Sequence, residues 1–189
     1  KSLVREASGQ PYVGLDIEGN GFFRYPEKVC LIQMSIGNVP YLIDPLYVED
    51  MSSLGPLLED DRTVKILHAG DYDIRSLNRD YGFIFANIFD TSIGAAFLGS
   101  KRLGLDAVLM QYIEVEVIKE KRLQRSDWTI RPLSDEAMVY AAGDVRYLGH
   151  ARQTMIRKLE DLRRYHWVLE ECERLCSVRY EPREEDTAF

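Results

Sequence analysis

The chain has 189 residues, of which 46% are hydrophobic and 29% charged. This length suits a single domain, and the composition is typical of a globular protein with a buried core, which excludes a disordered or collagen-like chain. Its 24 Lys and Arg residues against 31 Asp and Glu residues give a net charge of −7. That balance excludes a histone-like or polybasic membrane-surface protein, but it leaves room for local basic patches that contact nucleic acid.

The cysteine count indicates a reducing compartment. Cys30, Cys172 and Cys176 are an odd number of cysteines and too few for a disulfide scaffold, so we expect a cytoplasmic protein. A zinc site built from Cys172, Cys176 and His166 lacks a second pair of ligands at the usual spacing. No apolar run approaches the roughly 20 residues that span a bilayer, and no signal peptide is evident, so we expect no membrane partner. Because residue 1 is Lys rather than Met, we expect the chain to be an excised fragment.

The first predicted element after a polar lead-in (residues 1–10) is a strand at 12–18, where apolar residues alternate with Asp16 and Glu18. The other expected elements follow in chain order: a turn at 19–28, a hairpin of strands 29–36 and 39–45, a short helix at 50–60, a strand at 64–69, a helix at 73–82, a strand at 87–90, a helix at 91–99 capped by Asp90, a helix at 103–113, an irregular polar segment at 119–132, a helix from Ser134 to about 150, and a long amphipathic helix over about 152–176. This order predicts an α/β protein whose mixed sheet opens with an antiparallel hairpin and continues with parallel crossovers.

Two acidic residues end the first strand. Asp16 and Glu18 are two positions apart, so their side chains emerge on the same face, where two like charges cost energy unless a cation or a proton lies between them. A strand whose second face is simply solvated is the alternative interpretation.

A second acidic group follows the strand at 64–69, in the sequence His-Ala-Gly-Asp-Tyr-Asp at 68–73. We expect Asp71 to cap the next helix and Asp73, inside its first turn, to face a site. Sites in open α/β sheets lie beyond the carboxyl ends of strands, which is where both acidic groups fall.

The third group is Tyr140 and Asp144, which lie one turn apart on the same face of a predicted helix. Small or apolar residues make up the rest of that stripe, and a buried Asp there needs a partner or a metal. A structural salt bridge from Arg146 or Arg152 is the alternative.

Taken together, four carboxylates from three distant segments suit a pair of hard cations such as Mg²⁺, which prefers oxygen ligands and shares its shell with phosphate. Two such ions stabilise the attacking and leaving oxygens of a phosphoryl displacement, and Tyr140 is placed to hold the attacking water. The chain has no P-loop motif.

At these residues the sequence resembles the DEDD 3′–5′ exonucleases, in the branch that carries a tyrosine, and within it ribonuclease D. The resemblance runs from about residue 11 to about 160. The motifs that carry it are Asp-Ile-Glu (16–18), Val-Cys-Leu-Ile-Gln-Met-Ser (29–35), Tyr-Leu-Ile-Asp-Pro-Leu (41–46), Leu-His-Ala-Gly-Asp-Tyr-Asp (67–73), Phe-Asp-Thr (89–91), the stretch from Arg125 to Ser134, and Tyr-Ala-Ala-Gly-Asp-Val-Arg-Tyr-Leu (140–148).

The resemblance implies a ribonuclease H-like fold of the DnaQ-like exonuclease kind, with a mixed five-stranded sheet flanked by helices. It implies two divalent ions, Mg²⁺ or Mn²⁺, one held by Asp16, Glu18 and Asp144 and the other by Asp16 and Asp73, with Tyr140 orienting the attacking water. The variable position of the first motif is Ile17 here, where ribonuclease D often has Thr. We expect residues 1–176 to form one exonuclease domain and 177–189 to be an acidic, mobile tail or a linker to helical HRDC domains, which the fragment lacks.

Expected substrate contacts surround these acids. Lys121, Arg122 and Arg125 lie in a basic loop that begins at Lys119 and is suited to a nucleic-acid backbone, whereas the basic residues at 152–164 suit a solvated helix face. The aromatic residues Phe22, Phe23 and Tyr25 either stack on terminal bases or pack under the hairpin. Gln33 and His68, inside the resembling motifs, complete the expected set.

The function we predict is a 3′–5′ exoribonuclease that acts on the single-stranded 3′ end of RNA, such as a tRNA or other structured RNA, without an obligate protein partner. A DNA exonuclease of the same chemistry is the first alternative, since discrimination rests on a few contacts to the 2′-hydroxyl. The second alternative is a silent nuclease fold that acts as an RNA-binding adaptor. The presence of all four carboxylates and the tyrosine argues against it, because loss of activity would be expected to erase one of them.

Overall fold

A mixed five-stranded sheet forms the centre of the protein, whose structure, a computed structural model, describes residues 2–117 and 120–182. The strand order is β3-β2-β1-β4-β5. The strands are β1 (Tyr12–Gly19), β2 (Val29–Ile36), β3 (Val39–Ile43), β4 (Val64–Leu67) and β5 (Ile88–Asp90). Neighbours β1–β2 and β2–β3 are antiparallel, whereas β1–β4 and β4–β5 are parallel. The predicted α/β class, five-stranded mixed sheet and opening hairpin are confirmed.

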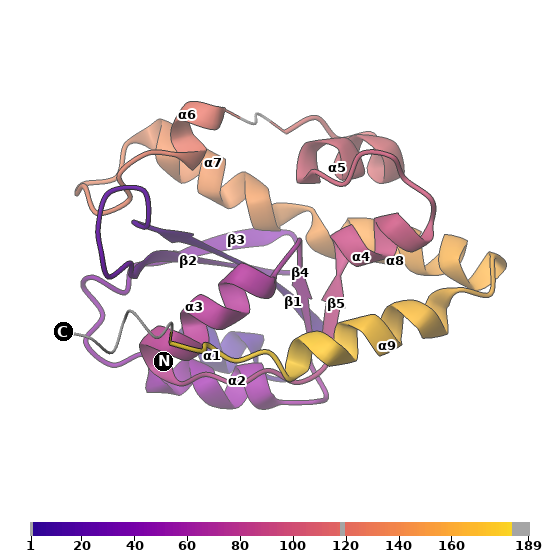
Figure 1. Ribbon diagram of the computed structural model, residues 1–189, viewed down its shortest axis with the longest axis horizontal. Coiled ribbons are helices and arrows are strands. Elements are labelled where there is room, and N and C mark those ends of the chain that lie inside the picture. The colour runs from indigo at the N-terminus through magenta and orange to yellow at the C-terminus, as the bar shows by residue number, and fades with distance from the viewer. Residues whose placement is uncertain (1, 118–119, 183–189) are drawn as a thin grey trace.

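Helices cover both faces of the sheet. They are α1 (Ser2–Ala7), a 3₁₀ turn η1 (Ser52–Leu54), α2 (Gly55–Glu59), α3 (Asp71–Tyr81), α4 (Thr91–Phe97), α5 (Leu105–Ile113), α6 (Lys121–Gln124), α7 (Asp135–Arg146), α8 (Leu148–Asp161) and α9 (Tyr165–Cys176). In Figure 1, α7, α5, α4 and α8 lie above the sheet, and α1, α2, α3 and α9 lie below it. The caps predicted from the sequence are present: Asp90 and Ser134 accept bonds from the first turns of α4 and α7, and Gly82 ends α3 with a φ of +69°.

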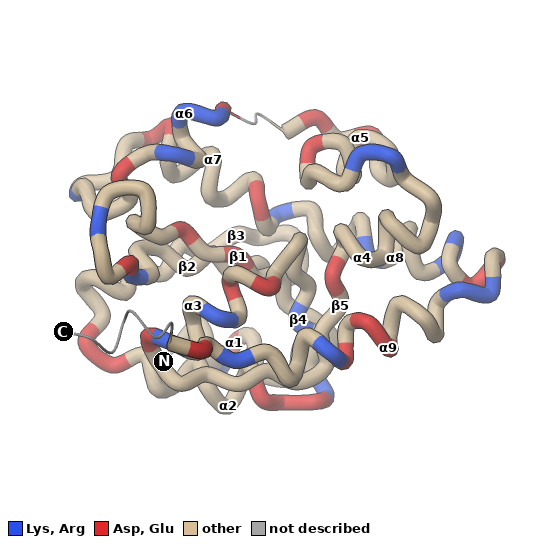
Figure 2. Tube along the Cα trace, in the orientation of Figure 1, with Lys and Arg blue, Asp and Glu red and all other residues tan. Residues whose placement is uncertain are grey.

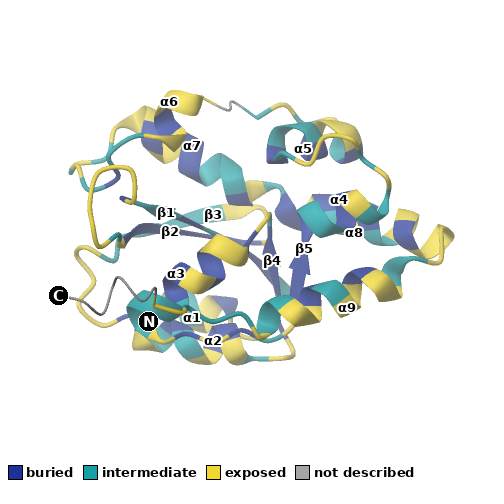
Figure 3. Ribbon diagram, in the orientation of Figure 1, coloured by how far each residue is buried: buried dark blue, intermediate teal, exposed yellow. Residues whose placement is uncertain are grey.

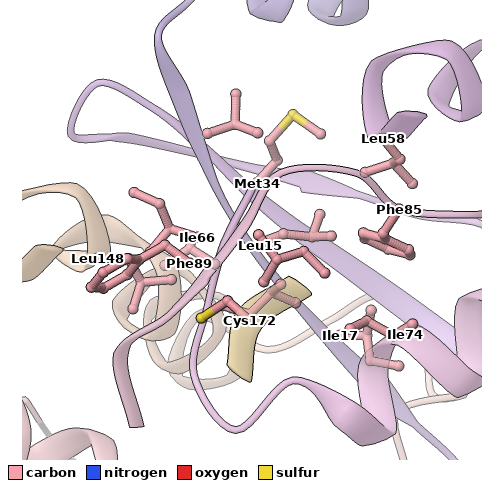
Figure 4. Packing of buried hydrophobic residues seen from close by; sticks show 14 of the residues in the cluster. Leu15, Ile17, Met34, Leu58, Ile66, Ile74, Phe85, Phe89, Leu148 and Cys172 are labelled. Atoms are coloured by element: carbon pink, nitrogen blue, oxygen red, sulfur yellow. The ribbon is translucent and has the colours of Figure 1, made fainter. Parts of the chain in front are cut away.

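The core fills both layers because successive residues of a strand point to opposite faces. Leu15 and Ile17 of β1 face the layer of α2 and α3, as do the labelled side chains Leu58, Ile74 and Phe85 in Figure 4. On the opposite face, Ile66, Phe89 and Leu148 pack under α7 and α8. Every residue of β2 is buried, so this strand is a rigid centre for both layers. Figure 3 shows that β4 and β5 are largely buried, whereas the edge strand β3 and the outer faces of the helices are more exposed.

The structure corrects three predicted elements. Residues 2–7 form α1 rather than an irregular lead-in, because Ala7 is fully buried in the core and Glu6 accepts a hydrogen bond from Tyr41 Oη. The polar segment before Ser134 contains the short helix α6, whose Leu123 is buried. The helix that starts after Ser134 ends at Arg146, and α8 begins at Leu148, four residues earlier than expected.

The long helix expected over about 152–176 is two helices, α8 and α9. The chain turns at Arg163, whose φ is +56°, and Arg164 donates a hydrogen bond to the carbonyl of Phe97. The turn folds α9 back against the sheet edge, where Val168 and Cys172 are buried and the Cys172 sulfur accepts a bond from the Asp90 amide. Burying the apolar face of α9 against the sheet stabilises the protein more than a single uninterrupted helix would.

The chain beyond α9 lies against α3. The Tyr180 amide donates to Asn78 Oδ1, and Arg75 donates to the carbonyl of Arg179. Residues 183–189 of the predicted acidic tail lie outside the described residues. Lys119, the first residue of the predicted basic loop, also lies outside them. Within residues 2–117 and 120–182, no helix is long and apolar enough to cross a membrane.

Candidate active site

The site begins with the close seating of α7 on β1. Gly14 lies on the face of β1 that also carries Asp16 and Glu18. A Cβ atom at Gly14 would lie 2.3 Å from Ser35 Oγ and 3.1 Å from the carbonyl oxygen of Val145, so only glycine leaves room here. Ser35 Oγ donates a hydrogen bond of 2.9 Å to that same carbonyl. Strand and helix therefore meet at backbone distance, which sets Asp144 beside Asp16.

Asp73 is placed by a carboxylate from the neighbouring strand. Asp90 is almost fully buried and accepts hydrogen bonds from the amides of Ala69 (3.1 Å) and Gly70 (2.8 Å), just before α3. The same carboxylate accepts from the amides of the first turn of α4. The predicted Asp71 cap is wrong: Gly70 is the N-cap residue, and Asp71 forms an ion pair with Arg75 at 2.7 Å. The turn before α3 is thus held from β5, and α3 carries Asp73 inward, as predicted.

The three motifs meet at one cleft. One carboxylate oxygen from each of Asp16, Glu18 and Asp144 lies within 4.8 Å of the other two. Asp73 and Tyr140 line the same cleft, which has a volume of about 630 Å³. Figure 2 shows acidic segments where β1, α3 and α7 approach one another. The face of β1 that carries Asp16 and Glu18 is therefore not a simply solvated one.

The crowded acids perturb one another. Burial, together with the charges of Asp73, Asp144 and Glu18, raises the pKa of Asp16 well above its ordinary value. Burial and the charges of Asp144 and Asp73 raise the pKa of Glu18 to about 9. The pKa of Asp73 is also raised, first by burial and then by neighbouring carboxylates, among them Asp90 and Asp144. Like charges at this range ionise together only when a cation lies among them.

Tyr140 is a buried residue with one polar end in the cleft. Its ring packs against that of Trp128, with centroids 6.1 Å apart and planes inclined by 36°. Burial, followed by the charge of Asp144, raises the pKa of the phenol above its ordinary value. Arg131 fixes the Trp128 segment by donating to the Trp128 carbonyl, to the Cys30 carbonyl and to the carboxylate of Asp44. The phenol is thus aimed by packing and stays protonated near neutral pH.

The donor set fits a hard divalent cation. The side chains at the centre of the cleft offer only carboxylate and phenol oxygens, the ligand type that Mg²⁺ and Mn²⁺ prefer. None of the described residues that line the cleft is Lys or Arg. Among the described residues of the cleft wall, no basic side chain therefore balances the negative charge of Asp16, Glu18 and Asp73, and a bound cation would balance it.

The predicted aromatic contacts are exposed. Phe22, Phe23 and Tyr25 are 71%, 51% and 77% exposed, and Phe22 lines the cleft. They do not pack under the hairpin, which was one of the two interpretations of the sequence. Their loop is tied to α3 through Glu27, which accepts hydrogen bonds from Tyr72 and Arg79.

The other predicted contacts divide between the cleft and its surroundings. His68 lines the cleft with its Nδ1 2.9 Å from Thr91 Oγ1. Lys121, Arg122 and Arg125 are exposed on and beside α6, where Arg122 forms ion pairs with Glu120 and Glu136. Gln33 is completely buried opposite Asp16 and is not part of the cleft wall.

Sequence reasoning missed several cleft residues. These are Glu27, Tyr72, Gln124 and the turn before α5 at Leu103–Leu105. Gln124 gave a weak signal, because it lies within the basic stretch that the sequence did single out. Tyr72 lies within the resembling motif at 67–73, but it was not assigned a role. Leu103 gave no signal, since a partly exposed apolar residue in a loop is ordinary.

This fold and this site define an α/β protein whose acidic cleft lies toward the carboxyl ends of its strands, an arrangement that suits a metal-dependent hydrolase. Residues 1–160 match the 3′–5′ exonuclease family. The chain therefore belongs to the 3′–5′ exonuclease family, and the resemblance to ribonuclease D seen in the sequence is confirmed.

Individual relatives support the same assignment. The chain is 35% identical to ribonuclease D of Pseudomonas paraeruginosa over 168 residues, which cover 88% of this chain and 44% of the relative. The crystal structure of Escherichia coli RNase D matches with a TM-score of 0.84 at 32% identity, over 93% of this chain and 46% of that one. The catalytic core of RRP6 from Trypanosoma brucei matches with a TM-score of 0.90 at 26% identity, over 99% of this chain and 52% of that one. The chain spans about half the length of these relatives, or less.

Proposed function

We propose that the chain is a 3′–5′ exoribonuclease that hydrolyses the last phosphodiester bond of an RNA 3′ end and releases a 5′-monophosphate. The observation that carries this proposal is the meeting of three carboxylates, from Asp16, Glu18 and Asp144, within 4.8 Å of one another in a cleft that also holds Asp73 and Tyr140. Family membership supports the reaction class, and the geometry supports these residues as its site.

Two divalent ions, Mg²⁺ or Mn²⁺, would be held by these acids, the first by Asp16, Glu18 and Asp144 and the second by Asp16 and Asp73. When bound, such ions stabilise the attacking and leaving oxygens of an in-line displacement. The protein contributes the placement: Asp16 and Glu18 come from a central strand, and Asp144 from a helix seated on that strand. Rigid elements hold such a constellation more accurately than loops do.

Tyr140 would orient the attacking water. Its raised pKa keeps the phenol protonated at neutral pH, so its contribution is mainly the aim of the water and only in part the removal of its proton. The packing against Trp128 supports this role because it fixes the direction of the ring.

The RNA strand would enter past the exposed aromatic loop. Phe22, Phe23 and Tyr25 offer faces on which terminal bases can stack, and His68 lies on the cleft wall below them. The exposed basic residues Lys121 and Arg125 on the α6 side would contact phosphates.

RNA is favoured over DNA by the relatives. The matching structure of Escherichia coli RNase D is described as an exoribonuclease involved in structured RNA processing. We infer the same substrate class for this chain, such as the 3′ end of a tRNA or other structured RNA, with residues 1–176 as the exonuclease domain. The free thiols of Cys30, Cys172 and Cys176 suit the cytoplasmic location predicted from the sequence.

The test is digestion of end-labelled single-stranded RNA and DNA, side by side, in Mg²⁺, in Mn²⁺ and in EDTA. We expect stepwise shortening of RNA from the 3′ end with either ion, none in EDTA and none with Asp16→Ala. A 3′-phosphorylated RNA should resist, because the added charge would enter the acidic cleft. Full activity in EDTA would contradict the metal mechanism, faster digestion of DNA would favour the DNA exonuclease, and cleavage of circular RNA would show an endonuclease. Binding of RNA without cleavage under every condition would favour the adaptor.

A further inference from the structure

Gln33 is a polar residue in the centre of the sheet. It lies in β2 directly opposite Asp16 of β1, and its side chain is 0% exposed. Directly opposed residues of an antiparallel pair carry their side chains on the same face, about 4.5–5.5 Å apart at Cβ. The amide of Gln33 is therefore within reach of the Asp16 carboxylate from beneath the cleft.

The neighbours of Gln33 on the same face show what covers it. Ser35, two residues along, bonds to the Val145 carbonyl of α7. Leu31, two residues in the other direction, packs in a cluster with Tyr140 and Ala141 of the same helix. Gln33 lies between these two contacts, so its side chain is enclosed between β2 and the turn of α7 that joins Tyr140 to Asp144.

Neither polar atom of the Gln33 side chain has a hydrogen-bond partner, although both are buried. Leaving a buried polar group unsatisfied costs about 1–3 kcal/mol, and such exceptions in a core call for a reason. A methionine has nearly the same length and would fill the site without that cost. Packing alone therefore does not explain the amide at this position.

We propose that Gln33 is a positioning residue for Asp16: its Nε2 donates a hydrogen bond to the Asp16 carboxylate when that carboxylate holds a divalent ion. This inference rests on the proposed function, which makes Asp16 the ligand common to both ions. Because Gln33 and Asp16 lie opposite each other on one face of the sheet, the Gln33 amide supplies a donor on the same face as the carboxylate and fixes which oxygen remains directed into the cleft.

An amide suits the positioning of Asp16 because it is neutral as well as correctly placed. An amide donor stabilises a carboxylate without adding a positive charge, whereas a Lys or Arg at the same position would compete with the ions for Asp16. Metal-binding carboxylates are generally hydrogen-bonded behind the metal, and loss of such a partner typically weakens metal binding by about 10–100-fold.

The test compares Gln33→Met with wild type in two measurements, Mn²⁺ affinity by isothermal titration calorimetry and thermal unfolding in EDTA. We expect the variant to bind Mn²⁺ about 10–100-fold more weakly, while its unfolding temperature in EDTA is equal to or above that of wild type. A merely structural residue would show the reverse. The matched control is Met34→Leu, a volume-conserving change at the next, fully buried position of β2, which faces the opposite layer and should leave Mn²⁺ affinity unchanged.

Gln33→Leu provides a second apolar variant if the methionine variant does not fold, and it carries the same expectation. Equal Mn²⁺ affinity of wild type and Gln33→Met would overturn the inference while leaving the proposed metal site intact. A wild-type chain that binds no Mn²⁺ would instead overturn the proposed function, and the inference with it. A loss of affinity shared by Met34→Leu would assign the effect to the strand rather than to the amide.

Discussion

Replacement of Gly14 by alanine tests how the active site is held together. The added methyl group would lie 2.3 Å from Ser35 Oγ and 3.1 Å from the Val145 carbonyl oxygen. Ordinary contacts begin near 3.4 Å, so Ser35 Oγ must rotate away, which breaks its hydrogen bond to α7, and the Val145 carbonyl must retreat from β1 by about 0.3 Å.

Overpacking of this kind costs about 1–3 kcal/mol. For a domain of this size each kcal/mol lowers the unfolding temperature by about 2–4 °C, so Gly14→Ala should unfold about 2–12 °C below wild type. Because the displaced helix carries Asp144 away from Asp16, Mn²⁺ affinity should fall as well. Thermal unfolding followed by circular dichroism measures the first effect, and isothermal titration calorimetry measures the second.

The chain offers a matched control in Gly143, which lies beside Asp144 in α7. A Cβ atom there meets nothing within 4 Å. Gly143→Ala should therefore stabilise the protein by about 0.5–1 kcal/mol, the usual gain for alanine inside a helix. In the double variant Gly14→Ala, Ser35→Ala, the 2.3 Å contact is removed, so it should be less destabilised than the two single changes combined. A Gly14→Ala variant as stable as wild type would refute the close seating of α7.

Three further predictions follow from the site. Glu18 has an ordinary pKa of 4.5 and a folded-state pKa of about 9, so the unfolded chain releases this proton at a lower pH than the folded chain does. In EDTA the free energy of unfolding should therefore fall as the pH rises from 4.5 to about 9. Saturating Mg²⁺ should flatten this dependence on pH. For one group this fall is at most about 1.4 kcal/mol per pH unit. Urea titrations at pH 6, 7 and 8 would measure the fall, and equal slopes in EDTA and in Mg²⁺ would argue against the prediction. Asp90→Asn leaves a single acceptor oxygen for the backbone amides before α3 and in the first turn of α4. The substitution should lower the free energy of unfolding by about 1–3 kcal/mol in urea denaturation and slow RNA cleavage. Wild-type stability and cleavage would show that the turn before α3 does not depend on Asp90. Tyr140→Phe should retain Mn²⁺ binding but lose about 10²–10⁴-fold in single-turnover rate, whereas Asp144→Asn should lose both; an active Tyr140→Phe would make the tyrosine a packing residue.

The strands and the acidic motifs could be predicted because their signals are local. Alternation marks the strand that carries Asp16 and Glu18, and helical spacing puts Tyr140 and Asp144 on one face. Asp90 was predicted as the cap of α4 from its place before that helix, which the structure confirms.

What the sequence did not reveal depends on contacts between distant segments. Asp90 also holds the turn before α3, a task that Asp71 was expected to perform, and nothing near Asp90 in the chain indicates it. The break at Arg163 contains neither Gly nor Pro, so the amphipathic pattern continues through it, and the burial of α9 against β5 decides the outcome. The six residues of α1 are too few to form a stable helix alone, and their order comes from the core.

The seating of α7 on β1 also has a consequence for synthesis of the protein on the ribosome. The chain emerges from its N-terminus, so Asp16 and Glu18 are made early, whereas Val145, whose carbonyl receives the Ser35 bond, is made late. Until α7 has emerged and docked, the two acids of β1 lack their third partner Asp144, and the phenol of Tyr140 is absent. A partly synthesised chain next to messenger and transfer RNA would therefore lack an assembled cleft. Docking of α7 on β1 is the step that completes the cleft.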